Sequence, residues 1–299
     1  MKTKAFFDMF LILCLFVMPA EAQLTLPRNT IRIDLDGSLH FGGDYFLRLE
    51  FFEDSELYDY NFDDATFQYI KVDELAYLEH CSFKNAVFWD GQILMRNKRR
   101  FKDCDFTNAY FRTNFILSIS PDVFVQTRNY QLKELKMGAF SGDFENFDFS
   151  DYEISCSFCP SITGAKFENA HFRKASIPAY FTQEQLKQTR NYRNGIFTEI
   201  QFLDPHRYAE YVPESLFREL DISNMSFSNC RLRGSFSGTN MTDTVFTESD
   251  LSTVEDLTLE QVKSTWNYKA GRMSLCKWPE YIEKALEEEE KAKAQEEKK

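Results

Sequence analysis

Large apolar residues recur along the chain at a spacing of five. Four blocks keep this spacing without a break: Leu78, Phe83, Phe88 and Ile93; Phe101, Phe106, Phe111 and Ile116; Ile162, Phe167, Phe172 and Ile177; and Phe236, Met241, Phe246 and Leu251. Shorter runs with the same spacing are Phe62 and Phe67; Phe144, Phe149 and Ile154; and Ile222, Phe227 and Leu232. Neither an α-helix, with a period of 3.6, nor a strand, with a period of two, produces a sustained period of five.

A small residue stands two positions before most of these large residues. Examples are Ala86, Ala109, Ala170, Cys81, Cys104 and Cys230. Residues two apart on an extended backbone point to the same side, so each five-residue unit has two inward and three outward positions. This pattern predicts a narrow coil that turns a corner every five residues. Four sides close a square, so one coil takes about 20 residues and the coils stack at about 4.8 Å.

The segments CSFKN-AVFWD, CDFTN-AYFRT and AKFEN-AHFRK carry this pattern in consecutive units. They resemble the pentapeptide-repeat family, whose motif is A-(D/N)-L-x-x with Leu or Phe at the centre. The resemblance covers roughly residues 55–95, 100–118, 142–179 and 220–253. It implies an all-β fold, a right-handed quadrilateral β-helix, with a stacked interior that includes Phe83, Phe88, Phe106, Phe111, Phe167, Phe172, Phe227 and Phe246. An ordinary β-sandwich is the alternative, but its strands alternate with a period of two.

A second repeat follows three of these blocks. The segments QTRNY (126–130), QTRNY (188–192) and STWNY (264–268) align without gaps. Nine residues before each Asn stands Ser120, Thr182 or Thr258, and these are favoured helix N-caps. Gln185 and Gln261 complete capping boxes three residues after the last two caps. The sequence therefore predicts short inserted helices of about three turns near 120–137, 182–194 and 258–270.

The Asn and Tyr residues of this second repeat have two interpretations. They are Asn129, Asn191 and Asn267, with Tyr130, Tyr192 and Tyr268. In the first interpretation each helix lies over the coil and the Asn amide bonds a free backbone group where the ladder is interrupted. In the second, the repeat is a ligand site. We favour the first, because an interrupting element must cover the exposed edge of a solenoid.

The ends of the chain predict further segments. Residues 1–22 have a basic start, an apolar run and a small-x-small ending at Ala20-Glu21-Ala22, as in a signal peptide; an uncleaved anchor or a buried helix is the alternative. Residues 23–54 predict an N-terminal β cap, because Ile31, Ile33 and Leu35 alternate with polar residues before an Asp-Gly turn. The coil is expected over 55–272, with an insertion at 197–219, and a charged helical tail over 273–299.

Composition narrows the class of protein. The chain of 299 residues has 31 Phe but only 11 Gly, a net charge of −12 and four His. Its richness in aromatic residues excludes a wholly disordered chain. A strongly acidic chain lacks the basic face that phosphate binding requires. Few His residues leave few candidates for metal ligands or a general base.

Six cysteines follow the signal segment. Cys81, Cys104 and Cys230 occupy the small inward position, where Cys serves as a compact apolar residue. Cys156 and Cys159 form a single CxxC without a second ligand pair, so redox or zinc chemistry there is the minority interpretation. Asn224 and Asn240 begin glycosylation sequons. No nucleophile elbow, phosphate-binding loop or dinucleotide fingerprint is present.

These features predict a secreted, extracellular or periplasmic, non-catalytic scaffold that is structural or binds an unidentified protein. We assign no catalytic, cofactor-binding or metal-binding residue, no nucleic-acid partner and no membrane span after signal removal. Some pentapeptide-repeat proteins are acidic DNA mimics that bind topoisomerase, and the net charge fits this alternative whereas the signal segment does not. A carbohydrate-active β-helix enzyme and a redox module at the CxxC are further alternatives.

Overall fold

The structure is a computed structural model that describes residues 32–33, 39–40, 45–46, 49–51, 56–72, 77–94, 101–178, 180–203 and 215–296. It divides into two compact units. The first comprises Met1–Phe115 with Gln126–Arg128, and the second comprises Ile116–Val125 with Asn129–Lys299. The signal segment predicted at 1–22 lies outside the described residues.

The first unit is a stack of short parallel strands. It contains β1 (Arg32–Ile33), β2 (Leu39–His40), β3 (Tyr45–Phe46), β4 (Leu49–Phe51), β5 (Glu56–Tyr58), β6 (Thr66–Phe67), β7 (Ile70–Val72), β8 (Tyr77–Glu79), β9 (Val87–Leu94), β10 (Phe101–Lys102) and the first part of β11 (Tyr110–Ser118). The strands β5, β8 and β10 form one parallel ladder, and β3, β6 and β9 form another. Among the described strands of this unit, β1 and β2 alone pair antiparallel. Bonded residues on neighbouring coils lie 21 or 23 positions apart, close to the 20 expected for four five-residue sides.

The interior of this unit consists of phenylalanine columns. The ring of Phe83 stacks between those of Phe62 and Phe106, at centroid distances of 5.0 and 4.9 Å. The ring of Phe88 lies 5.0 Å from Phe67 and 4.7 Å from Phe111. These distances match the spacing between strands, because each coil places the same residue type at the same position. All six rings are buried.

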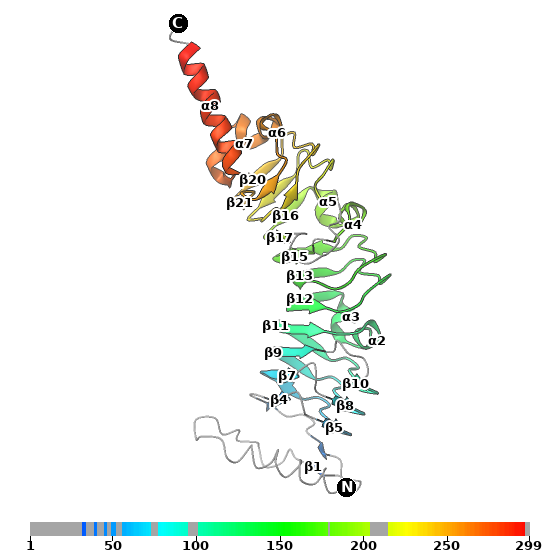
Figure 1. Ribbon diagram of the computed structural model, residues 1–299. Coiled ribbons are helices and arrows are strands. Elements are labelled where there is room, and N and C mark those ends of the chain that lie inside the picture. Colours follow the sequence, from blue (N-terminus) through cyan, green and yellow to red (C-terminus); the bar gives the residue numbers. More distant parts are fainter. Residues whose placement is uncertain are drawn as a thin grey trace, which may run out of the picture. The chain divides into compact units, whose positions relative to one another are not determined.

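The second unit is itself a stack of short parallel strands (Figure 1). Its strands are the end of β11, β12 (Glu134–Ser141), β13 (Glu153–Phe158), β14 (His171–Phe172), β15 (Ala175–Ile177), β16 (Ile196–Thr198), β17 (Ile200–Phe202), β18 (Ser226–Ser228), β19 (Gly234–Ser235), β20 (Val245–Thr247), β21 (Ser249–Asp250), β22 (Val254–Glu255) and β23 (Cys276–Lys277). Within the described part of this unit, the strand pairings are parallel. The two units therefore share a β-solenoid-like fold.

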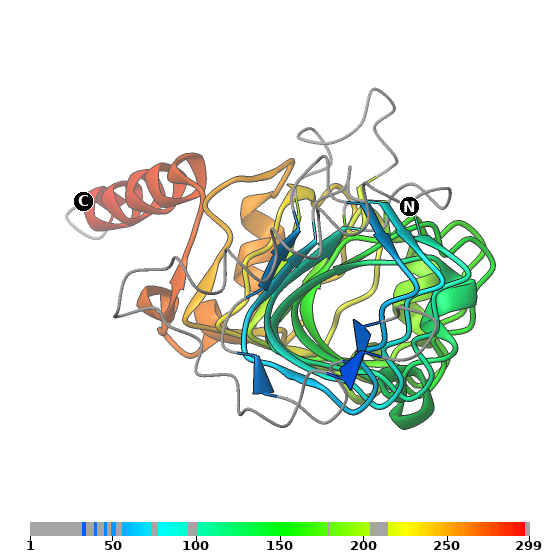
Figure 2. The same cartoon turned by 90° about the horizontal axis from the view of Figure 1, so that it is seen from below.

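Helices interrupt the coils of the second unit. They are α2 (Pro121–Phe124), α3 (Arg128–Leu132), which begins on a residue of the first unit, α4 (Gln183–Gln188), α5 (Arg190–Asn194), α6 (Leu259–Ser264), α7 (Trp266–Lys269), the 3-10 turn η3 (Met273–Leu275) and α8 (Glu280–Glu296). Figure 2 shows the strands of this unit superposed around a common interior, with its green helices on the outside of the coils. In the long helix α8, Ile282 is buried, and Glu289 forms an ion pair with Lys263 of α6, 2.5 Å apart.

The corners explain the scarcity of glycine. Among the residues that the structure describes, eighteen non-glycine residues have a positive φ between 50° and 64°, and most are Asn or Asp. Asn85, Asn108 and Asn169 each stand two positions after a buried Phe, where the chain turns. Asn and Asp tolerate this left-handed conformation better than other residues with a side chain. The coil therefore turns its corners mainly on Asn and Asp, and the low glycine content follows.

The predicted limits of the coil were too narrow. Strands β3 and β4 pair in parallel with β6 and β7, so residues 45–46 and 49–51 belong to the stack and not to a separate cap over 23–54. At the other end, β23 pairs with β21, which extends the coil to residue 277 and not 272. Residues at either edge lack the full five-residue motif, which is why the pattern alone ended too early.

The predicted insertion at 197–219 was wrong for most of its length. Phe197 stacks on Phe227 at 4.7 Å, and Phe217 stacks on Phe236 at 4.7 Å. Phe202 is buried as well. These residues belong to the coil, and only 204–214 remain between them, outside the described residues.

Two further predictions in the first helical region were wrong. Ile116 is 41% exposed, whereas Phe115 and Leu117 are buried, because the inward step after Phe111 spans four residues instead of five. The helix predicted over 120–137 ends at Leu132, and Glu134 already begins β12.

Candidate functional site

Each predicted insertion helix is a pair of short helices. The α4–α5 pair meets at Thr189, whose backbone is extended at φ −68° and ψ 151°. The Thr189 hydroxyl donates to Leu186 O at 2.6 Å and accepts from Tyr192 N at 3.2 Å, so one side chain ends α4 and begins α5. Thr265 makes the same two bonds between α6 and α7. The prediction of one continuous helix was therefore wrong.

The predicted capping boxes at Thr182 and Thr258 are confirmed. Each hydroxyl accepts from the backbone of Gln185 or Gln261, and each Gln side chain accepts from the cap residue's backbone. Ser120 makes no such bond, and α2 begins with Pro121 instead. Proline at the first helical position needs no partner for a backbone N–H.

Three amide side chains join the α4–α5 pair to the coil beside it. The Gln185 side chain donates to Ile162 O at 3.0 Å and to Ala165 O at 3.1 Å. Gln188 accepts from Phe167 N at 2.7 Å. The Asn191 side chain accepts from Phe172 N at 2.7 Å and donates to Phe172 O at 2.9 Å. Gln185, Gln188 and Asn191 are three residues apart in the helices. The coil residues that they bond, Ile162, Phe167 and Phe172, are five residues apart.

The α6–α7 pair repeats this arrangement. Gln261 donates to Phe236 O at 2.7 Å and to Thr239 O at 2.9 Å. Asn267 accepts from Phe246 N and donates to Phe246 O, both at 2.8 Å. A buried backbone group without a partner is costly. Each helix pair therefore supplies side-chain partners where the neighbouring coil strand is missing.

The three Asn residues also share a local bond. The amides of Asn129, Asn191 and Asn267 donate to the backbone oxygen five residues ahead, at 3.3, 3.1 and 3.3 Å. This bond fixes the exit of the chain from each helix pair. All three side chains are buried, so their geometry is that of structural anchors.

The three Tyr residues have different surroundings. Tyr130 is exposed and its ring lies 6.1 Å from that of Phe147. Tyr192 donates to Asp221 O at 2.7 Å, and Tyr268 is half-buried. The repeated motif therefore does not build the same pocket three times.

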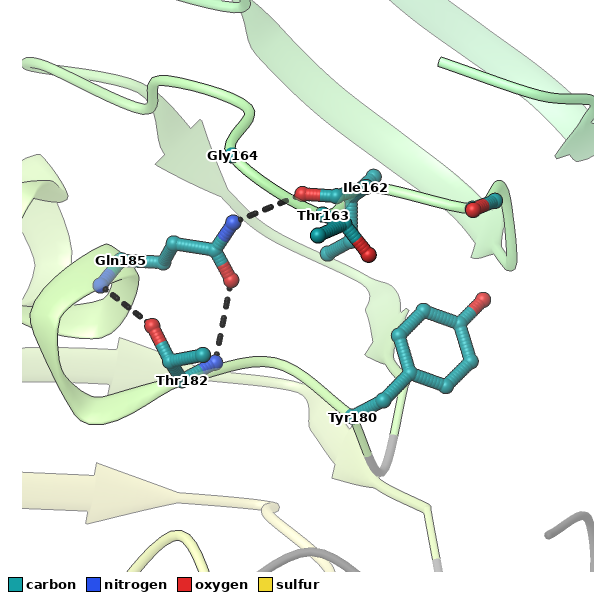
Figure 3. Close-up of a pocket in the computed structure, with 7 residues that line it drawn as sticks. Ile162, Thr163, Gly164, Tyr180, Thr182 and Gln185 are labelled. Atoms are coloured by element: carbon teal, nitrogen blue, oxygen red, sulfur yellow. Dashed lines mark hydrogen bonds between the residues drawn. The ribbon is translucent and has the colours of Figure 1, made fainter. Parts of the chain in front are cut away.

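A hollow of about 350 Å³ lies beside the start of α4 (Figure 3). Its lining residues are Ser161, Ile162, Thr163, Gly164, Tyr180, Thr182 and Gln185. The Gln185 amide that faces it is held by Thr182 and by coil carbonyls. The Tyr180 hydroxyl donates to Pro160 O at 2.6 Å, and burial raises the pKa of Tyr180 to about 12. The hollow contains polar contacts but no side chain suited to act as a nucleophile or base near neutral pH.

The first unit carries a stack of arginines and aromatic rings on its outer surface. The Arg112 guanidinium lies 4.1 Å from the ring centre of Trp89 and 5.3 Å from that of Tyr110. The Arg128 guanidinium lies 5.4 Å from the Tyr110 ring. Trp89 is 46% exposed. We call Trp89, Tyr110, Arg112 and Arg128 the arginine–aromatic stack. This stack was not predicted from the sequence. Trp89 follows Phe88 and Arg112 follows Phe111, so aligning the two repeats on these Phe residues would have placed Trp89 and Arg112 at equivalent positions on neighbouring coils.

Charged residues of the second unit are largely paired between coils. Glu153 contacts His171 and Arg190, both at 2.8 Å. Burial disfavours ionisation of Glu153, but hydrogen bonds from these two partners hold its pKa below the ordinary value. Within the described ranges no cluster of three or more His, Cys, Asp or Glu residues is arranged to hold a metal ion. No helix in the described part is long and apolar enough to cross a membrane.

Comparisons with known proteins give limited information. No family model matches the chain, and no curated protein matches it. Among solved structures, QnrB1, described as a plasmid-mediated fluoroquinolone resistance protein, matches with 14% identity and a TM-score of 0.16. That match covers 83% of this chain and 97% of the QnrB1 chain.

Proposed function

We propose that this chain is an exported pentapeptide-repeat protein, a right-handed quadrilateral β-helix that acts as a non-catalytic scaffold for a protein partner. The five-residue period and the Phe columns support the family and the cross-section. The consecutive five-spaced positions Leu78, Phe83, Phe88 and Ile93 are all buried, which is what a coil with four sides requires.

The arginine–aromatic stack is the observation that carries the binding proposal. Trp, Tyr and Arg dominate the binding energy of protein interfaces because they bury large surfaces and still make polar contacts. In this chain Trp89, Tyr110 and Arg112 lie on coil strands and Arg128 begins α3. They support one another through cation–π contacts, each worth about 0.5–1 kcal/mol at an exposed site. A partner would meet a surface that is ordered before binding, which lowers the entropic cost of association.

The charge distribution supports a scaffold over a DNA mimic. A mimic of the phosphate backbone needs rows of unpaired carboxylates. Residues 116–203 contain ten acidic and nine basic residues, so this stretch is nearly neutral. Many of its carboxylates pair with a base on a neighbouring coil or helix, as in Lys133 with Asp151, Lys174 with Glu199 and Arg193 with Glu168.

Export is inferred from the signal-peptide pattern of Met1–Ala22. Measuring the intact mass of the exported protein tests this inference. The intact mass of the exported protein should correspond to a chain that begins at Gln23. Retention of Met1 on exported protein would contradict the assignment of a cleaved signal peptide.

The binding proposal is tested by affinity capture from the extracellular or periplasmic fraction of the source. The variant combines Trp89→Ala and Arg112→Ala, and the control is Trp266→Ala, which removes a Trp that is 40% exposed outside the stack. We expect wild type and the control to retain the same protein and the double variant to lose it. Equal capture by all three would refute the assignment of this surface.

A further inference from the structure

The cysteines of the first unit stand in one column. Ser82 and Asp105 form a parallel bridge, and Asp105 N donates to Cys81 O at 2.9 Å. This register places Cys81 next to Cys104 on the neighbouring coil. Adjacent strands are about 4.8 Å apart, and the Cα atoms of disulfide-bonded cysteines are usually about 4.4–6.8 Å apart.

The two thiols also point to the same place. The Cys81 thiol contacts Glu79 O and the Cys104 thiol contacts Leu78 O, both at 3.6 Å. Cys81 is buried, whereas Cys104 is only half-buried and is therefore the thiol that a soluble oxidant reaches first.

We propose that Cys81 and Cys104 form a disulfide that links two neighbouring coils of the first unit. Glutathione disulfide first forms a mixed disulfide with Cys104 and releases one glutathione. The Cys81 thiolate then attacks the Cys104 sulfur, so the new S–S bond forms as the second glutathione leaves. Two protein thiols lose two protons and two electrons, and one glutathione disulfide becomes two glutathiones.

The other described cysteines are not placed to form a disulfide in the same way. In β13, Cys156 is buried whereas Cys159, which follows the strand, is exposed, so the two thiols of the CxxC lie on different sides of the chain. Ser249 separates Cys230 from Cys276, because it bonds Cys230 N and pairs with Cys276. Two strand spacings put those cysteines about 9.6 Å apart, beyond the reach of a disulfide.

The disulfide joins the two coils that present the arginine–aromatic stack. Cys81 lies in the coil that leads into β9 and Trp89, and Cys104 lies in the coil that leads into β11 and Arg112. Oxidation would therefore link the two coils that carry Trp89 and Arg112, whose cation–π contact measures 4.1 Å. This consequence rests on the proposed function, whereas the bond itself does not.

The test uses the purified full chain, reduced and then incubated with a defined mixture of glutathione and glutathione disulfide. Free thiols are alkylated under denaturing conditions, and each cysteine peptide is read by mass spectrometry. We expect Cys81 and Cys104 to be protected and linked to each other, while Cys156, Cys159, Cys230 and Cys276 are alkylated. The melting temperature should rise by several degrees on oxidation.

Three variants make the result specific. Cys81→Ser and Cys104→Ser should each lose the linked peptide and the thermal shift. The matched control, Cys159→Ser, should keep both. Full alkylation of Cys81 and Cys104 in wild type, or linkage to any other cysteine, would overturn the proposal. Because purified protein is oxidised without a partner, this outcome is independent of the capture experiment.

Discussion

Asn191 is the side chain whose removal best tests how a helix pair is attached to the coil. Replacing it with Ala deletes an acceptor for Phe172 N, a donor to Phe172 O and a donor to Ile196 O. The substitution should not disturb α5 itself, because Ala is the best helix former. The effect measured is therefore that of the lost side-chain bonds.

The magnitude follows from burial. Asn191 and Phe172 are both buried, so the N–H and C=O of Phe172 would be left without partners away from water. Each such group costs about 1–3 kcal/mol. For the two groups of Phe172 the expected loss of stability is therefore about 2–6 kcal/mol. For domains of this size the loss corresponds to a fall in melting temperature of roughly 4–24 °C, at about 2–4 °C per kcal/mol.

The assay combines thermal unfolding with amide hydrogen exchange. Solenoids unfold partly coil by coil, so a global melting curve alone averages the effect. Exchange at the Phe172 amide reports the affected bond directly and should become faster in Asn191→Ala. The matched control is Asn194→Ala, an exposed Asn three residues later in the same helix, which should change stability by about 0.5 kcal/mol or less.

The reasoning is refuted if Asn191→Ala melts like wild type and Phe172 keeps its protection. If such a stable variant also lost a binding partner, the Asn residues would form a ligand site, which is the interpretation we did not favour. A loss of stability in both variants would instead indicate a general sensitivity of α5.

Three other substitutions test the corners, the charges and the core. Asn224 is exposed and has a φ of 58°. Asn224→Ala should lower the free energy of unfolding by about 1 kcal/mol and Asn224→Gly by less, because a left-handed backbone is sterically unfavourable for Ala but not for Gly. Chemical denaturation of the two variants measures the difference. The partners of Glu153 keep the pKa of its carboxyl in the folded state below the ordinary value of 4.5. Ionised Glu153 therefore adds to the free energy of unfolding above that pH, and this stabilisation is lost as the pH falls below it. The destabilisation by Glu153→Gln should shrink as unfolding is followed from pH 7 to pH 3. Phe88→Ala should cost about 3–5 kcal/mol by leaving a cavity between Phe67 and Phe111, whereas Trp89→Ala next to it, at an exposed position, should leave the melting temperature nearly unchanged.

The interior of the coil was predictable because stacking repeats the same requirement at every turn. Phe83, Phe88 and Phe106 face the same environment as their neighbours above and below, so the five-residue period records burial directly. Prediction failed where one step changed length. After Phe111 the next inward residue is Phe115, and a pattern fixed at five selects the exposed Ile116 instead.

The outer surface was much less predictable. Outward positions have no periodic constraint, so Trp89 and Arg112 look like ordinary variation until the coil register places them side by side. The same holds for the disulfide proposed between Cys81 and Cys104. Their shared small inward position was visible in the sequence, but their adjacency depends on a coil of 23 residues that the sequence alone does not specify.

The break between paired helices has a physical reason in the coil. A straight helix of twelve residues would run about 18 Å in one direction, whereas the coil turns a corner every five residues. At the corner, Asn169 N donates to Gln188 O and Arg190 N donates to Ala170 O, on either side of Thr189.

The other two pairs show the same two bonds. Asn108 N donates to Gln126 O and Arg128 N to Ala109 O, around Thr127; Asp243 N donates to Ser264 O and Trp266 N to Thr244 O, around Thr265. On either side of this Thr, the inserted segment pairs with the coil through its own backbone, as a strand would. A continuous helix could not do this, because its backbone groups bond within the helix. The Thr of the second repeat is therefore required where the coil turns, and its extended backbone lets the second helix follow the corner.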